Sequence, residues 1–117
     1  MTQIINKVRL LENYGEYGNE FIVDIINMFF EEYTKDIQGM REAIIQNDAK
    51  KLDFHAHKIK SSFKNFSNPC TTGDLSFQLE MMGKNNDLSN AAAVYQELLN
   101  QTAIFIEDLN EIKKELI

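Results

Sequence analysis

The chain is poor in the residues that make turns and disulfide bonds. Of 117 residues, five are glycine, one is proline and one is cysteine, and there is no tryptophan. A fold of many short strands needs a turn about every ten residues, and this composition supplies too few turn-forming residues for it. Because Cys70 is the single cysteine, an intramolecular disulfide is excluded, and we expect a reducing, cytoplasmic location.

A long apolar stretch is also missing. A transmembrane helix needs roughly 20 consecutive apolar residues, and the most apolar run, FIVDIINMFF, contains Asp24 and Asn27. The first residues, MTQIINKVRLLENYGE, have neither the apolar core nor the cleavage site of a signal peptide. We therefore expect a soluble protein without membrane contact.

Positive charge is scarce relative to negative charge. Lysine and arginine number 12 against 18 aspartates and glutamates, which gives a formal net charge of −6 at pH 7. Such a surface repels nucleic acid and anionic membranes at long range. The expected partner is therefore another protein, and nucleic-acid binding is not expected.

Helix-forming residues are abundant, and apolar residues recur every three or four positions, as in helices with one buried face. With 44% hydrophobic residues, the chain has enough apolar material for one core, so we expect a single domain over residues 1–117. Helices are predicted over residues 3–13, over about 20–46, from Asp48 to before Pro69, from Thr71 to Gly83, and from Ser89 to the last residues. Short connections favour antiparallel neighbours, so the predicted fold is all-α, an antiparallel four-helix bundle with a short additional N-terminal helix at one end.

Several residues mark the expected helix ends. Asp48 is a good N-cap for the third helix. Thr71 and Asp74 resemble a capping box that starts the fourth helix, and Gly83 is expected to stop it. Ser89 is expected to cap the last helix.

Two positions stand out inside the predicted helices. Gly39 lies within the second helix, where glycine costs about 1 kcal/mol relative to alanine. In the last helix, Gln101 is predicted to be the polar member of an otherwise apolar seam. The other members of that seam are Ala91, Val94, Leu98, Phe105, Leu109, Ile112 and Leu116.

The third predicted helix has one apolar and one polar face. At about 100° per residue, one set of side chains falls within about 40° of Leu52. This apolar set is Ala56, Ile59, Phe63 and Phe66. A polar set, predicted to be exposed, falls between about 80° and 180° from Leu52. It consists of Asp53, His57, Lys60, Ser61 and Lys64.

The second histidine of this helix does not form a metal site with the first. His55 and His57 differ by about 200° around the helix, whereas metal ligands on one helix are spaced three or four residues apart. With a single cysteine and no third histidine, no metal site is predicted. Cys70 is interpreted as a small apolar filler, and no paired carboxylates or nucleophile–base spacing indicates a helical hydrolase.

Lysines are concentrated on the third helix. Five of the twelve basic residues, with Asp53 as the single acid, lie within residues 50–64, which carry a net charge of +4 against −10 elsewhere. Solvated helix faces usually mix charges of both signs, so we expect a negatively charged group to bind here. A phosphoryl group fits. Neutral imidazole, whose ordinary pKa is about 6.5, is a nucleophile at cytoplasmic pH, and Lys60 lies one turn beyond His57, where it can neutralise phosphoryl oxygens.

The same segment carries a family resemblance. AHKIKSS at residues 56–62 resembles the A-H-x-[LI]-K-G-S motif of histidine-containing phosphotransfer (HPt) domains. FFEEYTKDIQGMREAIIQNDAKKLDFHAHKIK is similar to the family's long helix, its Asp-containing turn and the helix that bears the histidine. Leu79 and Glu80, followed by Gly83, resemble the next helix, so the resemblance covers roughly residues 20–115.

The resemblance implies a four-helix bundle that relays phosphate between receiver domains of response regulators or hybrid histidine kinases, without ATP chemistry of its own. By position, His57 would be the phosphoacceptor, Lys60 the charge stabiliser and Ser61 the neighbour of the phosphoryl group. No cofactor is implied for this chain, because the Mg²⁺ of such systems is held by the receiver. We expect a monomer.

Two residues depart from the family pattern. Ser61 stands where the family usually has glycine directly after the motif lysine, and Ser67 stands where a second glycine is frequent. The side chain of Ser61 either crowds the approach of a receiver or donates a hydrogen bond to the phosphoryl oxygens. The alternative function is therefore a transfer-impaired bundle that binds receivers as an interaction or regulatory module.

Four further residues near His57 are candidates for receiver docking. They are Asp53, Phe54, Lys58 and Lys64. Phe54 falls about 200° from Leu52, where packing against a neighbouring helix is the favoured interpretation and exposure is the alternative. If exposed, its ring would form the apolar centre of a docking surface with a charged rim.

Overall fold

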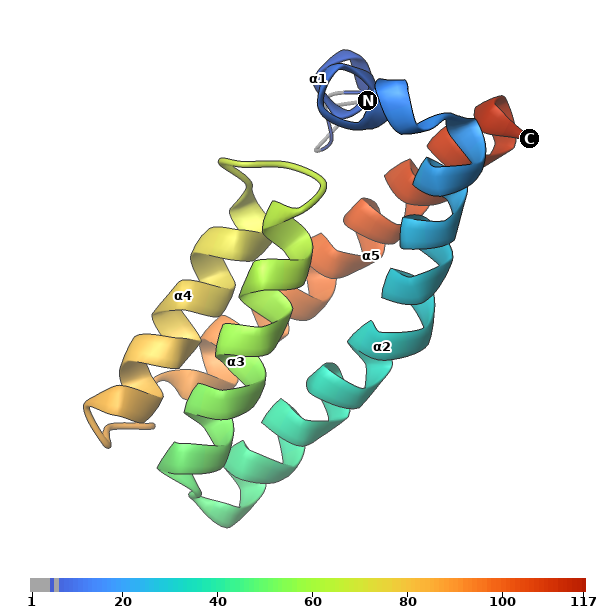
Figure 1. Cartoon of the computed structure of the whole chain (residues 1–117). Coiled ribbons are helices and arrows are strands. Elements are labelled where there is room, and N and C mark those ends of the chain that lie inside the picture. The colour runs from blue at the N-terminus through green and yellow to red at the C-terminus, as the bar shows by residue number, and fades with distance from the viewer. Residues whose placement is uncertain (1–4, 6) are drawn as a thin grey trace.

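The structure is a computed structural model that describes residue 5 and residues 7–117. These residues form helices and one 3₁₀ turn, with no strand among them. The elements are α1 (Lys7–Tyr14), η1 (Gly15–Tyr17), α2 (Asn19–Gln46), α3 (Ala49–Lys64), α4 (Thr71–Lys84) and α5 (Ala91–Leu116). Helices α2 to α5 run antiparallel as a four-helix bundle, and α1 lies across one end (Figure 1), which confirms the predicted fold. No helix of the described part is long and apolar enough to cross a membrane.

The N-terminal helix closes that end of the bundle. Ile5 and Leu10 are buried, and the backbone N–H of Ile5 donates to the carboxylate of Asp108 in α5 at 3.2 Å. Val8 of the same helix is 65% exposed. Residues 3, 4 and 6 of the predicted helix 3–13 lie outside the described residues.

Apolar side chains of all five α-helices meet in one continuous core. The predicted apolar set is confirmed: Leu52, Ala56, Ile59 and Phe63 of α3 are buried, and so is Phe66 in the turn that follows, because the helix ends at Lys64 rather than just before Pro69. The rings of Phe63 and Phe66 join those of Phe29 and Phe105, with centroid separations of 4.9 to 6.2 Å. Each such buried ring stabilises the fold by about 1.5–3 kcal/mol, so the core fixes which side of α3 faces solvent.

Helix α4 packs closely on α3 through small residues. Its buried face contains Thr72, Gly73, Ser76 and Gly83. A Cβ on Gly83 would lie 2.7 Å from the carbonyl oxygen of Ala49 and 2.7 Å from the backbone nitrogen of Asp53. The prediction that Gly83 stops the helix is therefore wrong, since Gly83 lies inside α4 and allows the close approach of α3.

Of the three predicted N-caps, one is confirmed. The carboxylate of Asp48 accepts a hydrogen bond from the backbone N–H of Lys51 at 3.1 Å. The capping box is wrong, because the cap of α4 is Cys70 and makes no side-chain cap bond. The cap of α5 is Asn90 rather than Ser89, whose hydroxyl instead donates to the carboxylate of Asp87 at 2.7 Å. Local hydrogen bonds compete for such side chains, so spacing alone does not decide which one caps a helix.

The polar positions in the buried face of α5 also differ from the prediction. Gln101 is partly exposed, and its amide donates to Glu97 at 3.3 Å, whereas Thr102 and Asp108 are buried. Helix α5 packs against both α2 and α4, so its buried face is broader than a two-helix seam.

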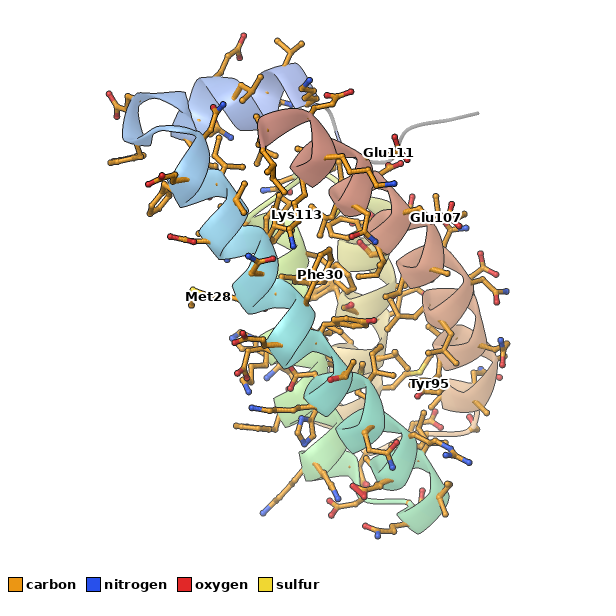
Figure 2. The ribbon with its side chains drawn as sticks, turned by 90° about the vertical axis from the view of Figure 1, so that its right-hand side faces the viewer. Met28, Phe30, Tyr95, Glu107, Glu111 and Lys113 are labelled. Carbon is orange, nitrogen blue, oxygen red and sulfur yellow. The ribbon has the colours of Figure 1, made fainter. Side chains whose placement is uncertain are left out.

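Contacts between α2 and α5 close the bundle on the side shown in Figure 2. The ammonium of Lys113 reaches from α5 to α2, where it donates to the amide oxygen of Asn27 at 2.7 Å. It also lies 5.8 Å from the centroid of the Phe30 ring. The hydroxyl of Tyr95 donates to the backbone carbonyl of Ile37 at 3.0 Å, and together these contacts tie α5 to α2 along the bundle.

Candidate functional site

His57 lies near the middle of α3 and faces solvent. Its side chain is 62% exposed, as its helical phase predicts, because the opposite face of α3 is buried. One of the two ring nitrogens nevertheless has a partner within the protein. The Nδ1 atom lies 2.9 Å from Oε2 of Glu80, a residue of α4 that is almost completely buried.

The carboxylate of Glu80 determines which ring nitrogen of neutral His57 carries the proton. Burial raises the pKa of Glu80, but the hydrogen bonds and charges of Lys60 and His57 outweigh that effect, so its pKa lies below the usual glutamate value. An ionised carboxylate only accepts hydrogen bonds, so Nδ1 of His57 must carry the proton. The lone pair of neutral His57 then lies on Nε2, the nitrogen that Glu80 does not bind.

Lys60 holds the other oxygen of the same carboxylate. Its Nζ lies 2.6 Å from Oε1 of Glu80, which has no other partner among the described residues. The ring of Phe77, one turn before Glu80 on α4, lies 5.1 Å from this ammonium. The Lys60 side chain is only 15% exposed, so the prediction of a fully exposed polar face is wrong for this residue.

A second lysine reaches the site from α4. Nζ of Lys84 lies 3.3 Å from the carboxylate of Asp53 and 3.8 Å from Oε2 of Glu80. Asp53 is therefore not an isolated acid at the edge of α3, because its carboxylate pairs with the end of α4. The close approach permitted at Gly83 places these residues side by side.

The second histidine points to a different helix. Nδ1 of His55 lies 2.9 Å from the buried carboxylate of Asp36 in α2, and the His55 side chain is 19% exposed. A Cβ on Gly39 would overlap the imidazole of His55, so this glycine makes room for the ring. The two histidines thus diverge as predicted, and the described residues contain no cluster of His, Cys, Asp or Glu that could hold a metal ion.

The lysines of α3 have more acidic partners than the sequence suggests. Nζ of Lys58 lies 3.7 Å from the carboxylate of Asp36, and Nζ of Lys51 lies 3.2 Å from that of Glu42. The expectation of a basic face without acidic partners counted only the acidic residues of α3 itself. It is wrong, because acidic residues of α2 and α4 pair with these lysines.

Ser61, Lys64 and Phe54 are exposed beside His57. The hydroxyl of Ser61 donates to the backbone carbonyl of His57 at 3.2 Å, which is a bond within the helix. Phe54 is 61% exposed, and its ring meets that of His55 edge-on at 5.0 Å. The favoured interpretation, that Phe54 packs against a neighbouring helix, is therefore wrong, and its ring is available on the surface.

Sequence reasoning missed the residues that α4 brings to the site. Glu80 was noted only as part of the family resemblance, and Lys84 and Phe77 were not noted. One local signal was present, since Glu80 and Lys84 are four residues apart and so share a helix face. That spacing also occurs on ordinary solvated faces, so it does not by itself indicate a buried carboxylate.

Comparison with known protein families finds a match over most of the chain. The family model of the Hpt domain matches residues 24–116. No curated protein and no solved structure matches the chain.

Proposed function

Because this chain belongs to the Hpt domain family, whose members carry phosphoryl groups in phosphorelays, we propose that His57 is its phosphoacceptor. It accepts a phosphoryl group on Nε2 from a receiver-domain aspartate and passes it to another receiver. The observation that carries this proposal is the bond between Nδ1 of His57 and Glu80, made by a side chain that is otherwise largely exposed.

The transfer needs no proton acceptor. The Nε2 lone pair attacks phosphorus, a P–N bond forms, the bond from phosphorus to the aspartyl oxygen breaks, and that oxygen leaves as part of a carboxylate. Nδ1 of His57 keeps its proton, so the phosphorylated ring carries a positive charge next to ionised Glu80. The buried carboxylate thereby stabilises the ring charge that develops during transfer, without having to reorient.

Lys60 supports this arrangement through its ion pair with Oε1 of Glu80. Its ammonium balances the buried charge of Glu80, which would otherwise be costly to hold in the core. The same ammonium provides positive charge one helical turn from the phosphoryl group. Lys60 therefore acts as a charge stabiliser that is shared between Glu80 and the phosphoryl oxygens.

The surface around His57 suits a transient protein partner. Phe54 gives an exposed aromatic ring one turn before His57, and charged side chains lie along the same helix, as in interfaces with an apolar centre and a charged rim. The charged residues are Asp53, Lys58 and Lys64, and Ser61 lies one turn after His57. We take this surface to dock receivers, and the chain to act as a monomeric, cytoplasmic phosphoryl carrier without kinase activity of its own.

Phosphate transfer from a labelled receiver tests the proposal. A receiver domain phosphorylated on its aspartate should transfer acid-labile label to the wild-type chain and to a His55→Gln variant, but not to His57→Gln. Circular dichroism and thermal unfolding of both variants establish that each remains folded. Label that persists in His57→Gln would place the acceptor elsewhere and overturn the assignment.

A second candidate function follows from Ser61. Its Cβ and hydroxyl stand on the exposed face one turn beyond His57, where a receiver must approach. The chain would then bind receivers without efficient transfer. Binding of a receiver without labelling, together with labelling restored in Ser61→Gly, would favour this function.

A further inference from the structure

The ammonium of Lys84 is shared between two carboxylates beside His57. It lies 3.3 Å from Asp53 and 3.8 Å from Oε2 of Glu80, the same oxygen that Nδ1 of His57 contacts at 2.9 Å. Because both groups contact the same oxygen of Glu80, the Lys84 ammonium and Nδ1 of His57 can be no farther apart than 3.8 Å plus 2.9 Å. The ammonium of Lys84 therefore lies on the Nδ1 side of the imidazole, and its half-exposed, flexible side chain can extend toward a group bound to Nε2 of the same ring.

Lys84 is held less firmly than Lys60. The Lys84 side chain is 49% exposed and its contacts with oxygen are 3.3 Å or longer, whereas Lys60 is 15% exposed and lies 2.6 Å from Glu80. Asp53 is itself partly exposed, so its pair with Lys84 is weakened by water and salt. Exchange of Asp53 for another anion therefore costs little.

Phosphorylation changes the charge that this cluster must balance. Before transfer, the ionised side chains of Asp53, Glu80, Lys60 and Lys84 sum to zero. Afterwards His57 carries a phosphoryl dianion on a ring with one positive charge, which leaves one net negative charge at the site. A dianion with three acceptor oxygens is a stronger partner for an ammonium than a single, partly hydrated carboxylate.

We propose that Lys84 is a second phosphoryl-binding cation, which leaves Asp53 when His57 is phosphorylated and pairs with the phosphoryl oxygens. This inference rests on the proposed function of His57. It gives Asp53 a role different from docking. The carboxylate of Asp53 holds the Lys84 ammonium before His57 is phosphorylated, and it competes with the phosphoryl group for that ammonium afterwards. Lys58 is less suited to this role, because its ammonium lies toward α2, 3.7 Å from Asp36.

The equilibrium of phosphate between a receiver and the chain tests this role. Lys84→Gln should shift the equilibrium toward the receiver by about 3- to 10-fold, and Lys84→Arg should restore most of the loss. Asp53→Asn, which frees Lys84, should shift the equilibrium in the opposite direction. The matched control is Lys35→Gln, which removes a lysine from an exposed ion pair with Glu32 in α2 and should change nothing.

A measurement on the unmutated protein provides an independent check. Phosphorylation with a small donor such as phosphoramidate, which needs no receiver docking, should change the NMR signal of the Lys84 ammonium far more than that of Lys35. If His57 takes up phosphate but Lys84→Gln behaves as Lys35→Gln does and the Lys84 signal does not move, this inference fails while the proposed function stands. If the wild-type chain takes up no phosphate, the proposed function itself fails.

Discussion

Glu80 of α4 holds Nδ1 of His57 of α3 at 2.9 Å and is itself almost entirely buried. A flexible surface histidine presents either nitrogen to a partner. Here Nδ1 is bound by a carboxylate that is fixed in the core, so Nε2 is the nitrogen that faces a partner.

Replacing Glu80 by glutamine should disturb the tautomer of His57. The neutral amide both donates and accepts hydrogen bonds, so Nδ1 of His57 is no longer obliged to carry the proton. In ¹⁵N NMR spectra the neutral imidazole of the wild-type chain should be protonated at Nδ1, and Glu80→Gln should show a mixture. Transfer should slow by at least about 10-fold. Glu111→Gln, at an exposed position of α5, is the control, and an unchanged tautomer in Glu80→Gln would contradict the argument.

Glu80 should also make the stability depend on acidic pH. Because its pKa is lowered in the folded state, its stabilisation is complete above the unfolded pKa and is lost as the pH falls through the folded one. The difference in free energy of unfolding between wild type and Glu80→Gln should therefore be constant down to about pH 5 and shrink below about pH 4. Urea denaturation at several pH values measures it. If the difference in free energy of unfolding stays the same from pH 7 to below pH 4, the ionised Glu80 carboxylate is not what stabilises the wild-type protein.

Gly83→Ala should destabilise the protein and slow transfer. The new Cβ would lie 2.7 Å from backbone atoms of α3, which cannot yield as a flexible side chain does. We expect a loss of about 1–3 kcal/mol in the free energy of unfolding, although alanine is the better helix former. Displacement of α4 also moves Glu80 away from His57. Gly15→Ala is the matched control, since nothing lies within 4 Å of its Cβ position; equal stabilities of the two variants would contradict this prediction.

Phe77→Leu should reduce the rate of transfer while leaving receiver affinity nearly unchanged. The leucine keeps apolar bulk but loses the ring face that attracts the Lys60 ammonium at 5.1 Å. A cation–π contact at a half-exposed site is worth about 0.5–1 kcal/mol, so the rate constant of transfer within the complex should fall by roughly 2- to 5-fold with little change in the receiver Kd. Phe77→Tyr, which keeps the ring, should behave as wild type. A change confined to the receiver Kd would instead assign Phe77 to docking.

The periodicity of apolar residues was sufficient to predict the bundle. The buried side of α3 and the exposure of His57 follow from helical phase alone, because each is a property of one helix. The N-cap role of Asp48 was also predictable, because it depends on a backbone N–H only three residues further along the chain. These features depend on residues within a few turns of one another, which is the range over which sequence patterns act.

The partners of His57 depend on how two helices meet, and no single helix encodes that. Glu80 is buried because small residues of α4 let α3 approach, and their effect is invisible until both helices are placed. Gly39 shows the same limit. Helix propensity marks it as a weak point, whereas in the fold it is the space into which His55 fits.

Helix α3 is held on both flanks by the same kind of bond. His55 binds a buried carboxylate of α2 and His57 binds one of α4, each through Nδ1 at 2.9 Å. Turning α3 about its own axis in either direction disturbs both bonds at once. The rotation angle of the helix is therefore fixed during folding, and little orientational entropy remains to be lost when a partner arrives.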